Sequence, residues 1–100
     1  MTHYALYTEL RAKPGKEEEL ASFLLGAQAL VADEAKTIAW FAVRFDKQTF
    51  AVFDAFDDEA GRQAHINGEV AAALGARAAD LLEGPLDIRH PSVLADKLPG

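Results

Sequence analysis

The strongest hydrophobic pattern in the chain lies between Thr37 and Phe56, where two apolar runs flank a short polar break. Strand-like alternation places Ala39, Phe41, Val43 and Phe45 on one face of the first run and Ile38, Trp40, Ala42 and Arg44 on the other. In the second run, Phe50, Val52, Asp54 and Phe56 share a face opposite Thr49, Ala51, Phe53 and Ala55. The pattern predicts a β-hairpin that is largely apolar on both faces, so both faces need cover.

The polar break predicts the turn and, through the turn, the pairing of the two strands. If Lys47 and Gln48 are the two loop residues, Phe45 faces Phe50, Val43 faces Val52 and Trp40 faces Ala55. Lys-Gln lacks the Gly or Asn that a tight hairpin turn prefers. A longer loop that begins at Asp46 is therefore the alternative.

The remaining segments follow from their periodicity and from Gly, Pro and acidic signals. Residues 4–12 alternate as a first strand, and residues 17–34 have helical spacing behind the acidic triplet Glu17-Glu18-Glu19. A second helix starts after Asp57 as its N-cap and stops at Asn67-Gly68, and a third covers residues 69–82. Residues 86–90 form a last extended segment, which Pro91 restricts to a sheet edge or a bulge.

The element order is therefore β-α-β-β-α(α)-β, over a single domain of residues 1–100. It predicts an α+β fold of the ferredoxin-like, split βαβ kind, with a four-stranded antiparallel sheet and its helices on one face. The helices leave the other apolar face of the hairpin uncovered. We expect a second copy of the chain to cover it, which gives a homodimer with a barrel-like core.

Composition excludes several classes of function. The formal charge of −6, with scattered Lys and Arg, disfavours nucleic-acid binding. The absence of cysteine removes disulfides, thiolate catalysis and Cys-ligated metals. His3, His65 and His90 are far apart and have no metal-ligand spacing, so we expect no metal site. No signal segment or bilayer-length apolar run is present, which makes the cytoplasm the expected location and a membrane partner unexpected.

Residues 37–88, together with the preceding PGKEEELASFL helix, resemble the antibiotic biosynthesis monooxygenase-like family of dimeric α/β barrels. The markers are the FAVFDAF strand, the DEAGRQAH helix and the small-residue helix after Asn67-Gly68. The resemblance implies a cofactor-independent monooxygenase that oxidises a small quinol or polycyclic phenol with O2. Two alternatives fit the same scaffold: a non-catalytic small-molecule-binding or stress-response barrel, and a lactone or diene isomerase.

Phenol oxidation without a cofactor requires a group that removes a proton, an apolar cavity and a hydrogen-bond donor near developing charge. His65 is the leading candidate, as a general base or a donor to substrate oxygen, against a structural role as a hydrogen-bonded histidine. Asp54 lies in an apolar strand, where burial can leave a carboxylate able to hold a proton. Its alternative is a structural bond to a backbone donor or to Arg44.

Three further residues are candidates for binding the substrate. Tyr7 and Trp40 are predicted to line an aromatic pocket, where the tyrosine hydroxyl supplies a hydrogen bond. Asn67 is predicted to orient a substrate oxygen, although its place before Gly68 also suits a simple helix end.

Overall fold

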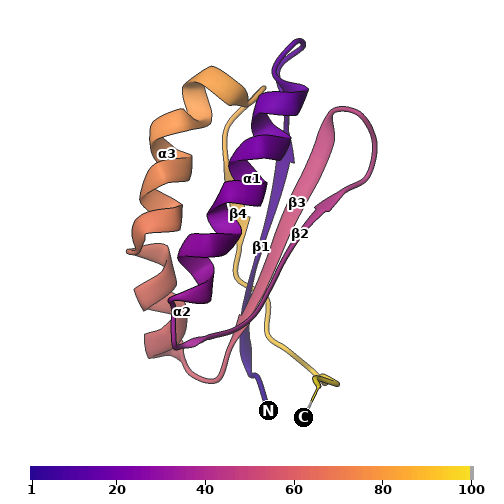
Figure 1. Cartoon of the computed structure of the whole chain (residues 1–100). Coiled ribbons are helices and arrows are strands. Elements are labelled where there is room, and N and C mark those ends of the chain that lie inside the picture. The colour runs from indigo at the N-terminus through magenta and orange to yellow at the C-terminus, as the bar shows by residue number, and fades with distance from the viewer. Residues whose placement is uncertain (100) are drawn as a thin grey trace.

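A four-stranded antiparallel sheet of order β2-β3-β1-β4 carries three helices on one face in the computed structural model, which describes residues 1–99 (Figure 1). The elements are β1 (Tyr4–Arg11), α1 (Glu17–Ala32), β2 (Thr37–Arg44), β3 (Thr49–Phe56), α2 (Glu59–Ile66), α3 (Glu69–Leu81) and β4 (Asp87–Arg89). Strands β2 and β3 form a hairpin, β3 also pairs with β1, and β4 pairs with the other side of β1. The predicted ferredoxin-like α+β fold is confirmed.

The helix boundaries follow local capping chemistry. Gly15 has a φ of 88°, which a residue without a side chain adopts freely, and it turns the chain into the acidic first turn of α1. The N-cap of α2 is Asp58, whose Oδ1 accepts a hydrogen bond from the backbone N–H of Gly61 at 2.7 Å. The prediction that Asp57 caps this helix was wrong by one residue.

The β2–β3 hairpin has a different register from the one that a two-residue loop predicts. Trp40 pairs with Asp54, Phe41 with Phe53 and Val43 with Ala51. The N–H of Phe45 donates to the carbonyl of Thr49, which encloses a loop of Asp46, Lys47 and Gln48. The Lys47-Gln48 turn was therefore wrong, and the alternative that begins at Asp46 is confirmed.

Asp46 explains the longer loop. Its Oδ1 accepts hydrogen bonds from the backbone N–H groups of Gln48 at 3.0 Å and Thr49 at 2.9 Å. A side chain that bonds its own backbone two residues ahead stabilises a turn that needs no glycine. Near its other end, β2 contains one extra residue, since Thr37 pairs with Phe56 whereas Ala39 already pairs with Ala55. Ile38 is thus a β-bulge on an edge strand.

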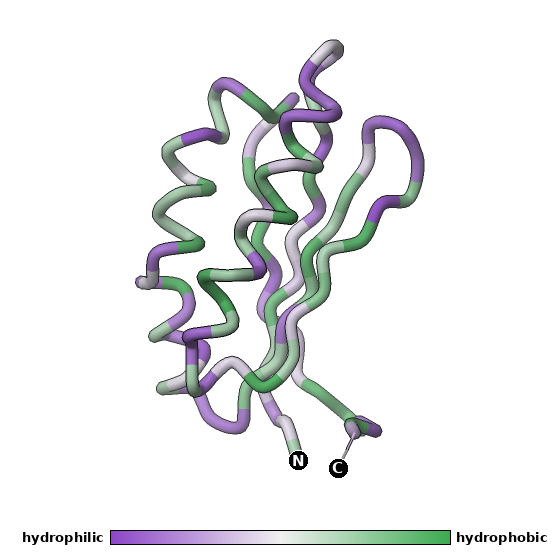
Figure 2. Tube along the Cα trace, in the orientation of Figure 1, coloured by the Kyte–Doolittle hydropathy of each residue, from purple (hydrophilic) through white to green (hydrophobic). Residues whose placement is uncertain are grey.

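The helices cover the sheet face that carries Leu6, Thr8 and Leu10 of β1, and apolar positions recur along α1 and the hairpin (Figure 2). One core cluster consists of Leu10, Ala12, Leu20, Leu24, Phe50, Leu81 and Leu82. A second consists of Ala27, Val31 and Val70, with Trp40 packed against it. Leu24 belongs to the first cluster and Trp40 borders the second, and the space between them is the cavity described below.

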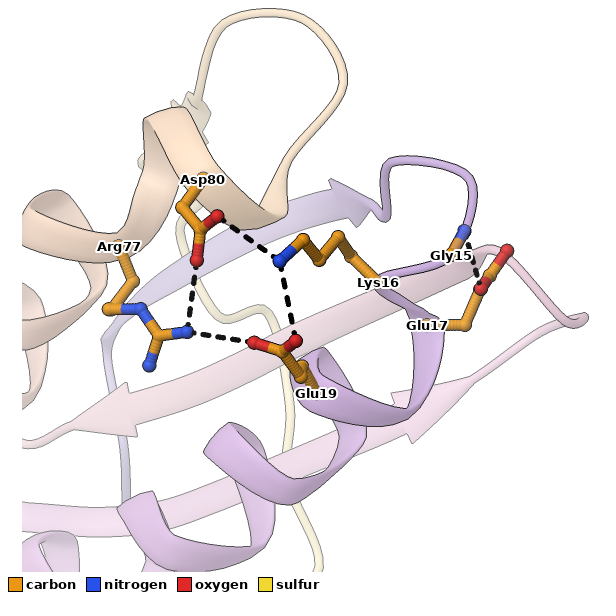
Figure 3. A network of polar contacts seen from close by, with 6 residues as sticks. All are labelled: Gly15, Lys16, Glu17, Glu19, Arg77 and Asp80. Carbon is orange, nitrogen blue, oxygen red and sulfur yellow. Dashed lines mark hydrogen bonds and ion pairs between the residues drawn. The ribbon is translucent and has the colours of Figure 1, made fainter.

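An ion network joins the start of α1 to the end of α3 at the surface (Figure 3). Nζ of Lys16 lies 3.3 Å from Glu19 and 3.4 Å from Asp80, and Arg77 lies 3.1 Å from each of the same two carboxylates. All four side chains are substantially exposed, so solvent and salt screen their attraction. The network orients the two helices more than it stabilises them.

The other face of the sheet bears large apolar side chains in solvent. Phe41 is 56% exposed, Val43 44%, Phe45 64% and Phe53 38%. Cross-strand pairing places all four on the side away from the helices. Within residues 1–99, no helix combines the length and the apolar character that crossing a membrane requires.

Candidate functional site

His65, near the end of α2, lies between two carboxylates. Its Nδ1 is 2.6 Å from Oε1 of Glu34, and its Nε2 is 2.8 Å from Oδ2 of Asp54. The imidazole is 8% exposed, Asp54 3% and Glu34 23%. The three side chains thus form a chain of hydrogen bonds from the buried face of the sheet towards the surface.

The main chain near α2 is shaped so that Glu34 can reach this histidine. Glu34 lies two residues beyond α1, and its Oε1 also accepts a hydrogen bond from the hydroxyl of Thr37 at 2.7 Å. Gly61 allows the loop to approach the helix closely, because a Cβ on Gly61 would lie 3.2 Å from Cβ of Lys36. The ring of Phe56 contacts the imidazole at 5.6 Å between centroids.

The two carboxylates determine the charge of His65. Burial alone would lower its pKa, but the hydrogen bonds and negative charges of Asp54 and Glu34 outweigh burial and raise the pKa from 6.5 to about 9. At neutral pH the ring is an imidazolium that donates from both nitrogens. Neither nitrogen is then free to accept a proton from a ligand, so the geometry does not support His65 as a general base.

A cavity of about 220 Å³ lies between the sheet and the helices beside this triad. Asp54 and His65 are its polar ionisable groups, and Thr8 of β1 adds a hydroxyl. The remaining lining is apolar or aromatic, from Leu6, Phe23, Leu24, Trp40, Val52, Ile66, Val70, Ala71, Leu74, Leu86 and Ile88. A small apolar chamber with a few convergent polar groups is the usual form of a small-molecule site.

Trp40 contributes its indole to the wall of the cavity. It is the cross-strand partner of Asp54, and its side chain lines the same space. The Nε1–H of Trp40 is buried without a hydrogen-bond partner within residues 1–99. An unpaired buried donor costs about 1–3 kcal/mol, so an acceptor on a bound ligand would be stabilising there.

The fold of this chain recurs in solved structures. It shares 56% identity with the NE2512 protein of unknown function from Nitrosomonas europaea, with a TM-score of 0.97 over 100% of this chain and 97% of that one. A second structure from the same organism, named as a putative antibiotic biosynthesis monooxygenase, superposes with a TM-score of 0.83 at 15% identity over 92% of this chain and 99% of that one.

A protein of the same name from Caulobacter crescentus CB15 superposes with a TM-score of 0.80 at 16% identity, over 94% of this chain and 92% of that one. The chain shares the fold of these proteins. No protein-family model and no curated protein sequence matches it. These likenesses show the fold, while the chemistry of this chain depends on its own cavity.

Three of the five predicted site residues meet at one place. His65, Asp54 and Trp40 all line the cavity. Asp54 bonds His65 rather than Arg44, which instead pairs with Glu18 at 3.0 Å and lies over the ring of Phe50. The alternative in which Asp54 bonds Arg44 was therefore wrong.

Tyr7 and Asn67 lie elsewhere. Tyr7 pairs with Phe53 and Arg89, on the sheet face away from the helices, so the prediction that it lines a pocket with Trp40 was wrong. Alternation already separates Tyr7 from Leu6 and Thr8, which line the cavity. Asn67 is the exposed C-cap of α2, and its side chain donates to the carbonyl of Gln63 at 3.0 Å. The helix-end alternative describes Asn67 correctly.

Glu34 is the member of the site that the sequence pattern did not indicate. It comes after the apolar positions of α1 and is not one of them. Its acidic side chain resembles many surface residues. Only the fold brings it to Nδ1 of His65. Within residues 1–99, no group of three or more acidic, His or Cys side chains is arranged to hold a metal ion.

Proposed function

We propose that this protein is a monooxygenase that oxidises a small, single-ring quinol with O2 and without a cofactor. The observation that carries the proposal is the cavity of about 220 Å³, which is lined by Asp54 and by its cross-strand neighbour Trp40, whose buried Nε1–H has no partner within residues 1–99. The relatives named as monooxygenases add support at the level of the scaffold.

The two polar groups suit one phenolic hydroxyl. A hydroxyl is both donor and acceptor, so it can donate to Asp54 while it accepts from Trp40. A carboxylate has acceptor sites on both oxygens, and the bond from His65 leaves capacity on Asp54 for a ligand. In this proposal Asp54 accepts the phenolic proton, and His65 is a positioning residue that holds the carboxylate.

Electrons and atoms balance without another reductant. The quinol supplies two electrons, one oxygen atom of O2 enters the ring to give a hydroxyquinone, and the other leaves as water. The apolar walls favour the reaction because in a space without bulk water, hydrogen bonds to a developing phenolate are stronger than in solution. O2 itself needs no charged site.

Cavity size discriminates between the two classes of substrate that the family resemblance implies. An apolar protein cavity of about 150 Å³ binds benzene. A space of about 220 Å³ therefore suits one ring with small substituents, and is small for the three fused rings of an anthrone. The proposal accordingly names quinols rather than polycyclic phenols.

Oxygen consumption tests the proposal. Wild-type protein should consume O2 with methylhydroquinone, above the rate of uncatalysed oxidation, and show little uptake with anthrones. Asp54→Asn should reduce the rate about 100-fold or more, since a positioned base contributes roughly 10²–10⁴. A separate surface hollow is lined by Glu34, His65 and Glu69. Glu69→Gln, which removes a carboxylate from this surface hollow, is the matched control and should retain the rate.

Three results would contradict the proposal or a part of it. If no quinol is consumed but quinols raise the melting temperature in a saturable way, the protein is a binding module, because a ligand selective for the native state stabilises it. Substrate conversion without O2 uptake would indicate an isomerase. Equal O2 uptake by wild type and Asp54→Asn would remove Asp54 from the chemistry.

A further inference from the structure

A second apolar space lies beside the cavity, on the outer side of β2. This groove of about 340 Å³ runs between α1 and the hairpin. Leu25 and Gln28 of α1 line one side of it, and Ala42 and Arg44 of β2 line the other. Nothing in the proposed reaction uses this groove.

Trp40 lies between the two spaces. It lines the inner cavity and the outer groove, and the only other residue common to both is Leu24 of α1. The indole packs against the second core cluster of Ala27, Val31 and Val70, which fixes it between α1 and α3. Trp40 and Leu24 thus form a partition between the two spaces, and Trp40 is its larger part.

We propose that Trp40 determines the ligand size of this protein, because its indole closes the inner cavity against the groove. The inference rests on the proposed function in one respect, namely that the ligand is a phenol or quinol. With the partition in place, the inner space suits a single ring. Without it, the cavity and the groove become one space within the range of pockets that hold larger molecules, about 300–1,000 Å³.

The polar anchor remains in place when the partition is removed. Asp54 belongs to β3 and is held by His65, so truncation of the indole leaves the carboxylate bond intact. A fused-ring phenol can then keep its hydroxyl on Asp54 and extend its outer rings between Leu25 and Ala42. The proposal therefore predicts a change in ligand class, in which the hydroxyl keeps its bond to Asp54 and loses the one from Trp40.

Anaerobic binding of phenol and 1-hydroxypyrene tests this inference. Wild type should prefer phenol to 1-hydroxypyrene in the inner cavity. Trp40→Ala should bind 1-hydroxypyrene at least tenfold more tightly than wild type does, and phenol several-fold more weakly. Trp40→Phe is the matched control, since it keeps an aromatic ring in the partition while it loses the N–H, and it should retain the wild-type discrimination against 1-hydroxypyrene.

Two results would overturn the inference: wild type binding 1-hydroxypyrene as tightly as Trp40→Ala, or Trp40→Phe gaining the larger ligand equally well. If Trp40→Ala does not fold, Trp40→Leu is the second variant and should show the same gain.

Binding without O2 separates this inference from the proposed reaction. A protein that consumes no O2 but switches ligand size at Trp40 would retain the partition and lose the oxygenase function. A protein that oxidises quinols but shows no switch would retain the function and lose the partition.

Discussion

His65 combines two features that seldom occur together in a small protein, a buried ring and a full positive charge. Burial of an unpaired charge is costly, and the cost is offset here by a carboxylate on each ring nitrogen. The bonds come from three separate segments: α2, β3 and the loop after α1. One imidazolium therefore fixes the relative positions of all three.

The raised pKa of His65 makes the stability of the protein depend on pH. With a folded-state value of about 9 against 6.5, the stabilisation is fully present below pH 6.5 and is lost as the pH rises through 9. The shift corresponds to about 3 kcal/mol. Urea unfolding should show a clear decrease in the free energy of unfolding between pH 6 and pH 9.5, and His65→Gln should lack this component.

Two carboxylate variants assign the effect to its cause. Glu34→Gln should lower the pKa of His65, measured from the imidazole proton resonances, and move the loss of stability to lower pH. Glu69→Gln removes another carboxylate from the surface hollow that Glu34 and His65 line, and it should leave the pKa of His65 near that of the wild type. If both variants shift it equally, general surface charge and not the bond to Nδ1 sets the value.

For individual residues, the sequence predicted which side chains belong to the site but not which of them contact one another. Asp54 and His65 each stood out as polar residues in apolar surroundings, but their contact depends on how α2 lies over β3. Nothing in local spacing encodes that placement. Glu34 is an acidic residue at the end of the predicted helix, as many surface residues are, and therefore carried no signal.

Among the elements, the β2–β3 hairpin decides which side chains reach the cavity. A register shifted by one residue would pair Trp40 with Ala55 in place of Asp54, and the two polar groups of the cavity would lose their alignment. The element order and the helix positions followed from hydrophobic periodicity. The register did not, because it depends on Asp46, whose side chain replaces the glycine of a tighter turn.

The turn residue can be tested directly. Asp46→Ala removes the acceptor for the N–H groups of Gln48 and Thr49, so both amides should exchange with solvent faster and the melting temperature should fall by a few degrees. Lys47→Ala is the control, since the loop uses the backbone carbonyl of Lys47, which accepts from Arg44, and not its side chain. Unchanged exchange in Asp46→Ala would mean that strand pairing alone sets the loop.

The whole molecule has one sheet face covered by helices and one that is open. The aromatic side chains of Phe41, Phe45 and Phe53 lie on the open face. At about 25 cal/mol per Å² of apolar surface, cover for such a face is worth several kcal/mol. The homodimer that the sequence predicts remains our expectation for this surface.

Sedimentation at micromolar concentration should therefore give a dimer, and Phe41→Glu should give a folded monomer because it places a charge in the centre of the apolar face. Leu25→Glu changes an apolar side chain that is 78% exposed on α1, away from this face, and should remain dimeric. A wild-type protein that sediments as a monomer would contradict the expectation.

The extra residue in β2 has a bearing on how copies of this chain associate. Strand β2 lies at the end of the sheet, where unpaired backbone groups invite another strand to add on. The bulge at Ile38 interrupts the regular spacing of those groups, so end-to-end ribbons of sheets are disfavoured. The irregularity thus disfavours open-ended fibres and is compatible with the closed pair that we expect.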